Sequence, residues 1–268
     1  MIRLVHILDD CRCYHRSMGF KDHFSSFATH YSSHRPGYPE VLFEYLASLA
    51  PDRELAWDCA TGNGQAARGL AGYFDHVVAT DVSADQIQSA VPCASVEYRV
   101  EPAEEPSLEV ESVDLVLVAQ ALHWLDWDRF YPVATSVMKP GAVFAAITYE
   151  LCFVAPAADQ AIDHLYRNIL KTYWPPERIY VQEQYRTLPF PYRELKPPQF
   201  QIEVAWTLDE LMGYLGTWSA VNRYREDTGE DPLELIAADI RVAWGDTSDQ
   251  RMVTWPMTTR VGRKIAGA

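Results

Sequence analysis

Short apolar segments alternate with helical patterns over the first 150 residues. The helical patterns begin at Pro39, at Gln65, after Ser83 and after Asp126, with apolar residues three or four positions apart. The apolar segments between them, which we expect to form strands, are 55–57, 76–80, 96–100, 113–119 and 142–148. Strands that alternate with helices are typical of βαβ units. The sequence therefore predicts an α/β fold with a doubly wound, mostly parallel sheet.

The pattern changes after residue 150. A helix with Ile162 and Leu170 on its apolar face should end at Trp174-Pro175-Pro176, and the next 20 or so residues are rich in proline and aromatic residues. We interpret 151–198 as a lid or substrate cap. Its aromatic residues would exclude water from a site, or else form a small satellite core: Trp174, Tyr180, Tyr185, Phe190 and Tyr192.

The remaining segment, 199–268, is expected to complete the sheet and to carry C-terminal helices. Residues 201–206 and 252–261 have strand patterns, with Pro256 indicating an edge or a bulge. Between them, Thr207 and Glu210 form a capping box that opens a helix.

Composition and charge narrow the function classes. The chain has 268 residues, 48% of them apolar, and a formal net charge of -14, which argues against nucleic acid or an anionic membrane as partner. No apolar segment approaches the roughly 20 residues needed to cross a bilayer. The five cysteines are too dispersed for a disulfide framework, and Cys11-Arg12-Cys13 is too weak a pattern to predict a metal. We expect a soluble, cytoplasmic protein without a metal.

A glycine-bearing turn follows the first predicted strand. Gly62-x-Gly64-x-x-Ala67, with Asp81 at the end of the next strand, matches the dinucleotide-binding pattern loosely. However, Asp58 lies four residues before the first glycine and would repel a pyrophosphate there. S-adenosylmethionine has a ribose, carries cationic groups and lacks phosphate, so it suits this acid better. A nicotinamide-dependent oxidoreductase and a cofactor-binding module without catalysis remain the alternatives.

Longer motifs give a resemblance to a known family. The motifs are Arg35-Pro36-Gly37-Tyr38-Pro39, the Asp58 to Gln65 loop, Thr80-Asp81-Val82-Ser83, Pro102-Ala103-Glu104-Glu105 and Ala119-Gln120-Ala121-Leu122-His123-Trp124. From about Phe20 to Thr259 the chain resembles the class I S-adenosylmethionine-dependent methyltransferases, and within them the trans-aconitate methyltransferase-like branch. The resemblance implies a seven-stranded Rossmann-like methyltransferase sheet with an inserted cap. It also implies S-adenosylmethionine as cofactor and a small-molecule methyl acceptor such as a carboxylate, with the protein a monomer or homodimer.

The start of the resemblance and the change of pattern near residue 150 give the expected domain limits: an N-terminal extension at 1–19, a cofactor-binding core at 20–150, the lid at 151–198 and the final segment at 199–268. The family pattern further suggests Met18 as the natural start.

The same resemblance assigns roles to individual residues. Asp58, Ala60, Gly62 and Gly64 would line the methionine and ribose parts of the cofactor. Asp81, with Val82 beside it, would accept hydrogen bonds from the ribose hydroxyls. The other implied cofactor residues are Ala103 and Glu104 at the adenine, Ala119 and Gln120 beneath the methionine end, and Tyr31 and Arg35 closing over the cofactor.

Two residues depart from the family pattern. Ala60 replaces the first glycine of the loop, which requires a negative φ at this position. Pro102 stands where many members of the class carry an acid, which puts the contact to the adenine amino group in doubt.

Methyl transfer depends mainly on alignment, and a general base is needed only for a protonated acceptor. For a carboxylate acceptor, Arg35, Arg223 and Arg225 are candidate partners. His123 and Trp124 are predicted to line the acceptor pocket, with His123 as a base or a hydrogen-bond partner; simple packing of this pair is the alternative.

Overall fold

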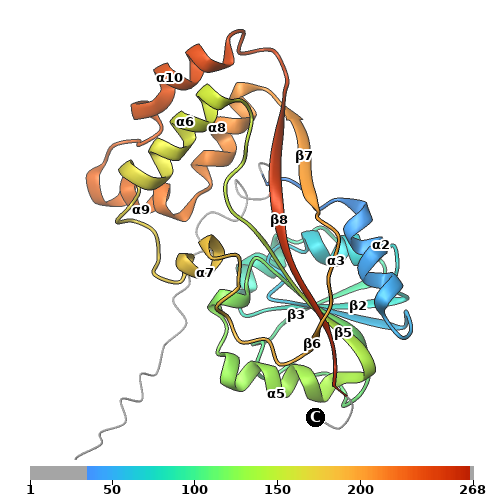
Figure 1. Ribbon diagram of the computed structural model, residues 1–268. Helices are drawn as coiled ribbons and strands as arrows, with labels where there is room; N and C mark the ends of the chain where they lie inside the picture. The colour runs from blue at the N-terminus through green and yellow to red at the C-terminus, as the bar shows by residue number, and fades with distance from the viewer. Residues whose placement is uncertain (1–34, 266–268) are drawn as a thin grey trace, which may run out of the picture.

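A computed structural model describes residues 35–265 of the protein (Figure 1). Its sheet contains eight strands, seven of them in the order β3-β2-β1-β4-β5-β8-β6, and the eighth, β7, pairs with β8. The strands are β1 (Leu55–Cys59), β2 (His76–Asp81), β3 (Val96–Val100), β4 (Val113–Ala119), β5 (Met138–Tyr149), β6 (Arg193–Glu194), β7 (Gln201–Trp206) and β8 (Arg251–Arg263). Strands β1 to β5 are parallel, and β8 is antiparallel to β5. The predicted doubly wound α/β sheet is confirmed.

Helices cover both faces of this sheet because strand side chains alternate between two cores. On β5, Val143, Ala145 and Ile147 join the core that also buries α2 (Glu40–Leu49) and α3 (Gln65–Leu70). Phe144 and Ala146 point to the opposite core, with α5 (Trp127–Val137). The short α4 (Ala84–Gln88) connects β2 to β3. Burial on both faces explains the continuous apolar runs of the parallel strands.

Strand β8 changes its partner midway along its length. Its first half pairs with β7 as far as Pro256, and its second half pairs with β5 from Met257 onward. Pro256 is exposed at the changeover, a position that tolerates a residue without an N–H donor. The position of Pro256, which the sequence associated with an edge or a bulge, is the point where β8 changes its partner from β7 to β5.

A group of helices lies on the side of the sheet to which the carboxyl end of β5 leads (Figure 1). Its members are α6 (Pro156–His164), the π-helical turn η3 (Leu165–Ile169), α8 (Leu208–Gly216), α9 (Ser219–Thr228) and α10 (Glu234–Trp244). Helix α6 packs against α10. The helical group therefore draws on segments before and after residue 198, where the sequence suggested a boundary.

The capping box predicted at Thr207 is present and opens α8. Helix α7 (Arg178–Gln182) follows the proline pair and contacts the 3-10 turn η2 (Leu122–Trp124), which comes directly after β4. None of the helices between residues 35 and 265 is long and apolar enough to cross a bilayer.

Candidate active site

The glycine turn leaves the carboxyl end of β1, which lies between β2 and β4 at the point where the strand order reverses. Ala60, Gly62 and Gly64 have φ values of +55°, +59° and +79°. The expected negative φ at Ala60 is therefore wrong: the alanine adopts the left-handed conformation of the glycine it replaces. The N–H of Thr61 donates to the Thr80 carbonyl at 2.9 Å, which anchors the strained turn to β2.

At Gly64, close packing against the end of the Tyr98 side chain adds to the constraint of the backbone angle. A Cβ at this position would lie 2.4 Å from the Tyr98 hydroxyl oxygen. At Gly62 the nearest atom to such a Cβ would be Gln86 Oε1, at 3.7 Å, so only the backbone conformation disfavours a side chain there.

Asp58 is completely buried at the end of β1. Its Oδ2 accepts a hydrogen bond from the Thr61 hydroxyl. The Ala67 N–H lies near the carboxylate, but no group in the described part of the chain makes a well-formed hydrogen bond to Oδ1. Burial raises the pKa of Asp58 to about 7, against the lowering effects of Thr61 and the Ala67 N–H. A buried carboxylate with an acceptor atom that lacks a hydrogen-bond partner favours a cationic N–H donor on a ligand.

Asp81 is held in place by the turn and by the start of α4. Its Oδ2 accepts from the Gly62 N–H at 2.8 Å and its Oδ1 from the Ser83 N–H at 2.9 Å. The Ser83 hydroxyl caps α4 by accepting a hydrogen bond from the Gln86 N–H. The Ser83 N–H donates to Asp81, so the Gln86 side chain does not complete a capping box with it. An ionised carboxylate has about four acceptor positions, so ribose hydroxyls can donate to this fixed group as well. Val82, beside it, is 41% exposed.

Negative charge gathers around the end of β1. Burial raises the pKa of the Cys59 thiol, and three neighbouring acids raise it further: Asp58, Glu104 and Asp81. Glu104 Oε1 accepts from the Asp126 N–H at 3.2 Å, and Ala103 is buried beside it. These acids disfavour a pyrophosphate at the turn and favour a cationic ligand.

Gln120 connects the ends of β4 and β5. Its φ is +58°, its Nε2 donates to the Tyr149 carbonyl at 3.1 Å, and its Oε1 accepts from the Thr148 hydroxyl at 2.6 Å. The amide is therefore bound to β5, and the predicted role of Ala119 and Gln120 beneath the methionine end of the cofactor stays a prediction.

His123 is buried in η2, where it contacts the predicted lid. Its Nδ1 lies 2.8 Å from the Tyr185 hydroxyl oxygen, and its ring centre lies 4.7 Å from that of Trp124. Burial lowers the pKa of His123 to about 3, and the Arg178 cation contributes to the lowering. A neutral imidazole with this pKa favours hydrogen bonding over proton abstraction.

The candidate arginines have different surroundings. The Arg35 guanidinium lies 5.4 Å from the centre of the Tyr214 ring on α8. Arg223 Nη1 donates to the Tyr173 carbonyl at 3.2 Å, and Arg225 pairs with Asp231 at 2.8 Å. The internal pairing of Arg225 reduces its value as a partner for an acceptor. Tyr31, the extension at 1–19 and the Cys11–Cys13 pair lie outside the described residues.

The sequence analysis did not identify the roles of two residues near His123, Tyr185 and Arg178. Tyr185 belongs to the predicted aromatic segment, but its role as a hydrogen-bond partner of His123 depends on tertiary structure. Arg178 carries no motif, and only its place beside a proline pair and aromatic residues sets it apart in the sequence.

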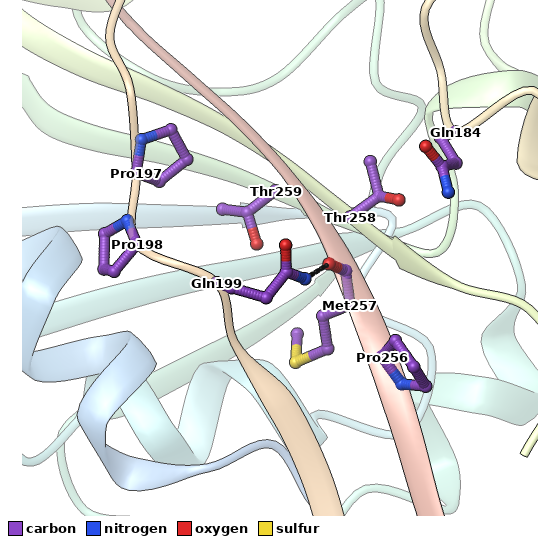
Figure 2. A pocket seen from close by; sticks show the side chains of 8 residues that line it. All are labelled: Gln184, Pro197, Pro198, Gln199, Pro256, Met257, Thr258 and Thr259. Carbon is purple, nitrogen blue, oxygen red and sulfur yellow. Dashed lines mark hydrogen bonds between the residues drawn. The ribbon is translucent and has the colours of Figure 1, made fainter. Parts of the chain in front are cut away.

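A cavity of about 240 Å³ lies beside β8 (Figure 2). Gln184, Pro197 and Thr259 are among its lining residues, and the Gln199 side chain donates to the Met257 carbonyl at 2.7 Å. None of the predicted cofactor residues in the described ranges lines this cavity, so it is separate from the glycine turn.

The doubly wound sheet, its antiparallel β8 and the acid-flanked glycine turn together define a Rossmann-like methyltransferase. Comparison with known proteins agrees: a family model described as a methyltransferase domain matches residues 57–146. A solved structure from Anaeromyxobacter dehalogenans, provisionally named a type II methyltransferase, is 48% identical and superimposes with a TM-score of 0.82. The match covers 86% of this chain and 98% of that one. The chain belongs to the methyltransferase family.

More distant relatives have the same family name. A provisionally named methyltransferase of Dictyostelium discoideum is 29% identical over 87% of this chain and 91% of its own length. An uncharacterized methyltransferase of Mycobacterium tuberculosis is 35% identical over 48% of this chain, and the match spans 52% of that protein.

Proposed function

We propose that the protein is an S-adenosylmethionine-dependent methyltransferase that methylates a small molecule, with a carboxylate compound of the trans-aconitate kind as the favoured acceptor class. The observation that carries the cofactor assignment is the buried Asp58, whose Oδ1 accepts from no described residue. Its position at the strand-order reversal is where doubly wound sheets bind ligands.

The residues present fit this cofactor. The α-ammonium group would donate to Asp58, and the ribose hydroxyls would donate to Asp81, whose orientation is set by Gly62 and Ser83. The acids around β1 oppose a pyrophosphate, so the nicotinamide-dependent alternative is not favoured.

When bound, the cofactor supplies an electrophilic methyl group on a positively charged sulfur. Transfer of this methyl group would use an electron pair of the acceptor oxygen for the new C–O bond, and the electron pair of the broken C–S bond would remain on the sulfur and neutralise it. The protein's contribution would be orientation: Ala119 and Gln120, at the end of β4, would support one side of the reacting centre, and His123 on the following turn η2 would lie next to it. An ionised carboxylate acceptor needs no base, which agrees with the low pKa of His123.

The acceptor class rests on the resemblance and on charge. A net charge of -14 opposes nucleic acid as acceptor, and it also means that an anionic small molecule must be held by local cations. The branch that the sequence resembles acts on a carboxylate, which is the reason for favouring this class.

The test is a methyl-transfer screen with labelled S-adenosylmethionine and small carboxylic acids, including trans-aconitate, beside their amides. We expect label in an acid and formation of S-adenosylhomocysteine. Asp81→Asn should reduce the rate at limiting cofactor by about tenfold or more, the loss of a hydrogen-bonded charged group. Asp85→Asn, an exposed residue of α4, is the matched control and should retain the wild-type rate. Equal rates for Asp81→Asn and wild type would contradict the assigned site.

A further inference from the structure

A second cavity, of about 400 Å³, lies between the helical group and α7. This volume is within the range of small-molecule pockets, about 300–1,000 Å³. Its lining includes three cations and two aromatic side chains, and no aspartate or glutamate is among the described lining residues. The residues that define its chemistry are Tyr166, Arg167, Lys171, Trp174, Arg178 and Gln182. In a protein with 37 acids and 23 Lys and Arg residues, such a lining is unusual.

Arg178 is held in a fixed orientation without an acidic partner. Its Nε donates to the Tyr166 hydroxyl oxygen at 3.0 Å, and its guanidinium carbon lies 5.1 Å from the Trp174 ring centre. Among residues 35–265, no carboxylate or carbonyl accepts from its terminal nitrogens, whereas Arg167 in the same lining is paired with Asp163. The two terminal nitrogens thus remain available as a planar donor pair.

The Tyr166 hydroxyl adds a further donor. Tyr166 is 1% exposed, and its oxygen accepts from Arg178 Nε and from Gln182 Nε2, each at 3.0 Å. These two donors fill both acceptor positions of the hydroxyl, so its own proton must point elsewhere. No acceptor for that proton occurs in the described part of the chain. With Gln182 in this orientation, the hydroxyl proton is available to an acceptor oxygen of a ligand in the cavity.

The cavity adjoins the candidate active site through α7. This helix contributes Arg178 and Gln182 to the cavity and packs against η2, which holds His123 and follows β4 directly. Arg178 is near enough to His123 for its charge to lower the pKa of the imidazole. A ligand in the cavity would therefore lie beside the acceptor edge of the sheet.

We propose that this cavity binds the methyl acceptor by a carboxylate group, which accepts hydrogen bonds from Arg178 and Tyr166. Lys171 adds positive charge at the rim of the cavity, and Trp174 contacts a flat apolar skeleton of the acceptor. The proposal rests on the proposed function, since it assigns the acceptor of that same reaction. The proposed carboxylate partner is Arg178, which the sequence did not single out, in place of Arg35, Arg223 and Arg225.

The test is calorimetric binding to the full chain saturated with S-adenosylhomocysteine, with trans-cinnamate as probe and the neutral trans-cinnamamide as its isosteric comparison. We expect cinnamate to bind about tenfold or more tightly than the amide, because a charge-assisted pair is lost in the amide. Arg178→Gln should weaken cinnamate by a similar factor and leave S-adenosylhomocysteine affinity unchanged. Arg186→Gln, an exposed arginine of the next turn that does not line the cavity, should change neither.

Several outcomes would overturn the proposal: no cinnamate binding, equal affinity for acid and amide, or unchanged cinnamate affinity in Arg178→Gln. If Arg178→Gln fails to fold, Tyr166→Phe serves as the second variant, and full cinnamate affinity there would count against the site. Failure of S-adenosylhomocysteine to bind the wild type would instead overturn the proposed function. The two failures are therefore distinguishable.

Discussion

Asp58 is the residue on which the cofactor assignment depends. A carboxyl group this deeply buried loses its hydration, and in the described structure only Oδ2 gains a side-chain donor. Burial raises the pKa of Asp58 to about 7, so near neutral pH its protonation state is sensitive to what binds beside it. A cationic ligand group favours the ionised form.

The affinity for S-adenosylhomocysteine should therefore depend on pH. Below the raised pKa of about 7, binding to the α-ammonium must first remove the proton from Asp58. Affinity should fall as the pH decreases from 8 to 6, by at most about tenfold per pH unit, and binding should release a proton. Calorimetry in buffers of different ionisation enthalpy measures both effects. Asp58→Asn should bind weakly at every pH; a pH-independent affinity in the wild type would count against this role.

Gly64 allows a second prediction at the residue scale. Gly64→Ala combines a φ of +79° with a Cβ only 2.4 Å from the Tyr98 hydroxyl oxygen, whereas Gly229→Ala has a φ of +74° and no atom within 4 Å. Gly229→Ala should cost about 1 kcal/mol in unfolding free energy and leave cofactor affinity unchanged. Gly64→Ala should cost clearly more and also weaken S-adenosylhomocysteine binding. Chemical denaturation and calorimetry on both variants check this, and equal behaviour would show that the turn is not shaped by Gly64.

At the scale of elements, the segment after α7 is fastened to the sheet and to η2. Arg260 Nη1 on β8 donates to the carbonyls of Tyr185 and Leu188 at 2.7 and 2.9 Å. The Tyr185 hydroxyl lies 2.8 Å from His123 Nδ1, and Tyr192 stacks on Phe144 at 4.6 Å. Most of the predicted aromatic segment thus packs as core in this structure, and a lid movement remains a prediction.

Removal of the Tyr185 hydroxyl should weaken this docking. Tyr185→Phe leaves a buried imidazole nitrogen without its partner, which should lower the unfolding free energy by about 1–3 kcal/mol. Tyr180→Phe, a half-buried tyrosine of α7 whose ring packs on Trp127, is the matched control and should change it by less than about 0.5 kcal/mol. Urea denaturation measures both unfolding free energies. Equal losses in the two variants would show that the hydrogen bond between Tyr185 and His123 does not stabilise the fold.

Local patterns predicted the elements well where burial is periodic. Strands β1 to β5 and helix α5 followed from apolar runs and from the Asp126 cap, because the signal for each element lies within its own short segment. The helical group could not be delimited in this way, since α6 and α10 meet across some 80 residues of chain. Arg178 was missed for the same reason: its importance comes from Tyr166 and from η2, which are brought to it by folding.

At the scale of the whole molecule, charge is distributed unevenly. The net charge of -14 includes acids gathered at the carboxyl end of β1, while the cavity beside α7 is lined by cations. A cationic cofactor and an anionic acceptor would each find a region of opposite sign. Helix α7, which lines the cavity, contacts η2, the element that follows β4.

Titration of the purified full chain with S-adenosylhomocysteine and, separately, with NADH tests the central claim most directly. We expect one S-adenosylhomocysteine bound per chain, no measurable binding of NADH, and an affinity for S-adenosylhomocysteine weakened by about tenfold or more in Asp81→Asn. Tight binding of NADH without binding of S-adenosylhomocysteine would contradict it.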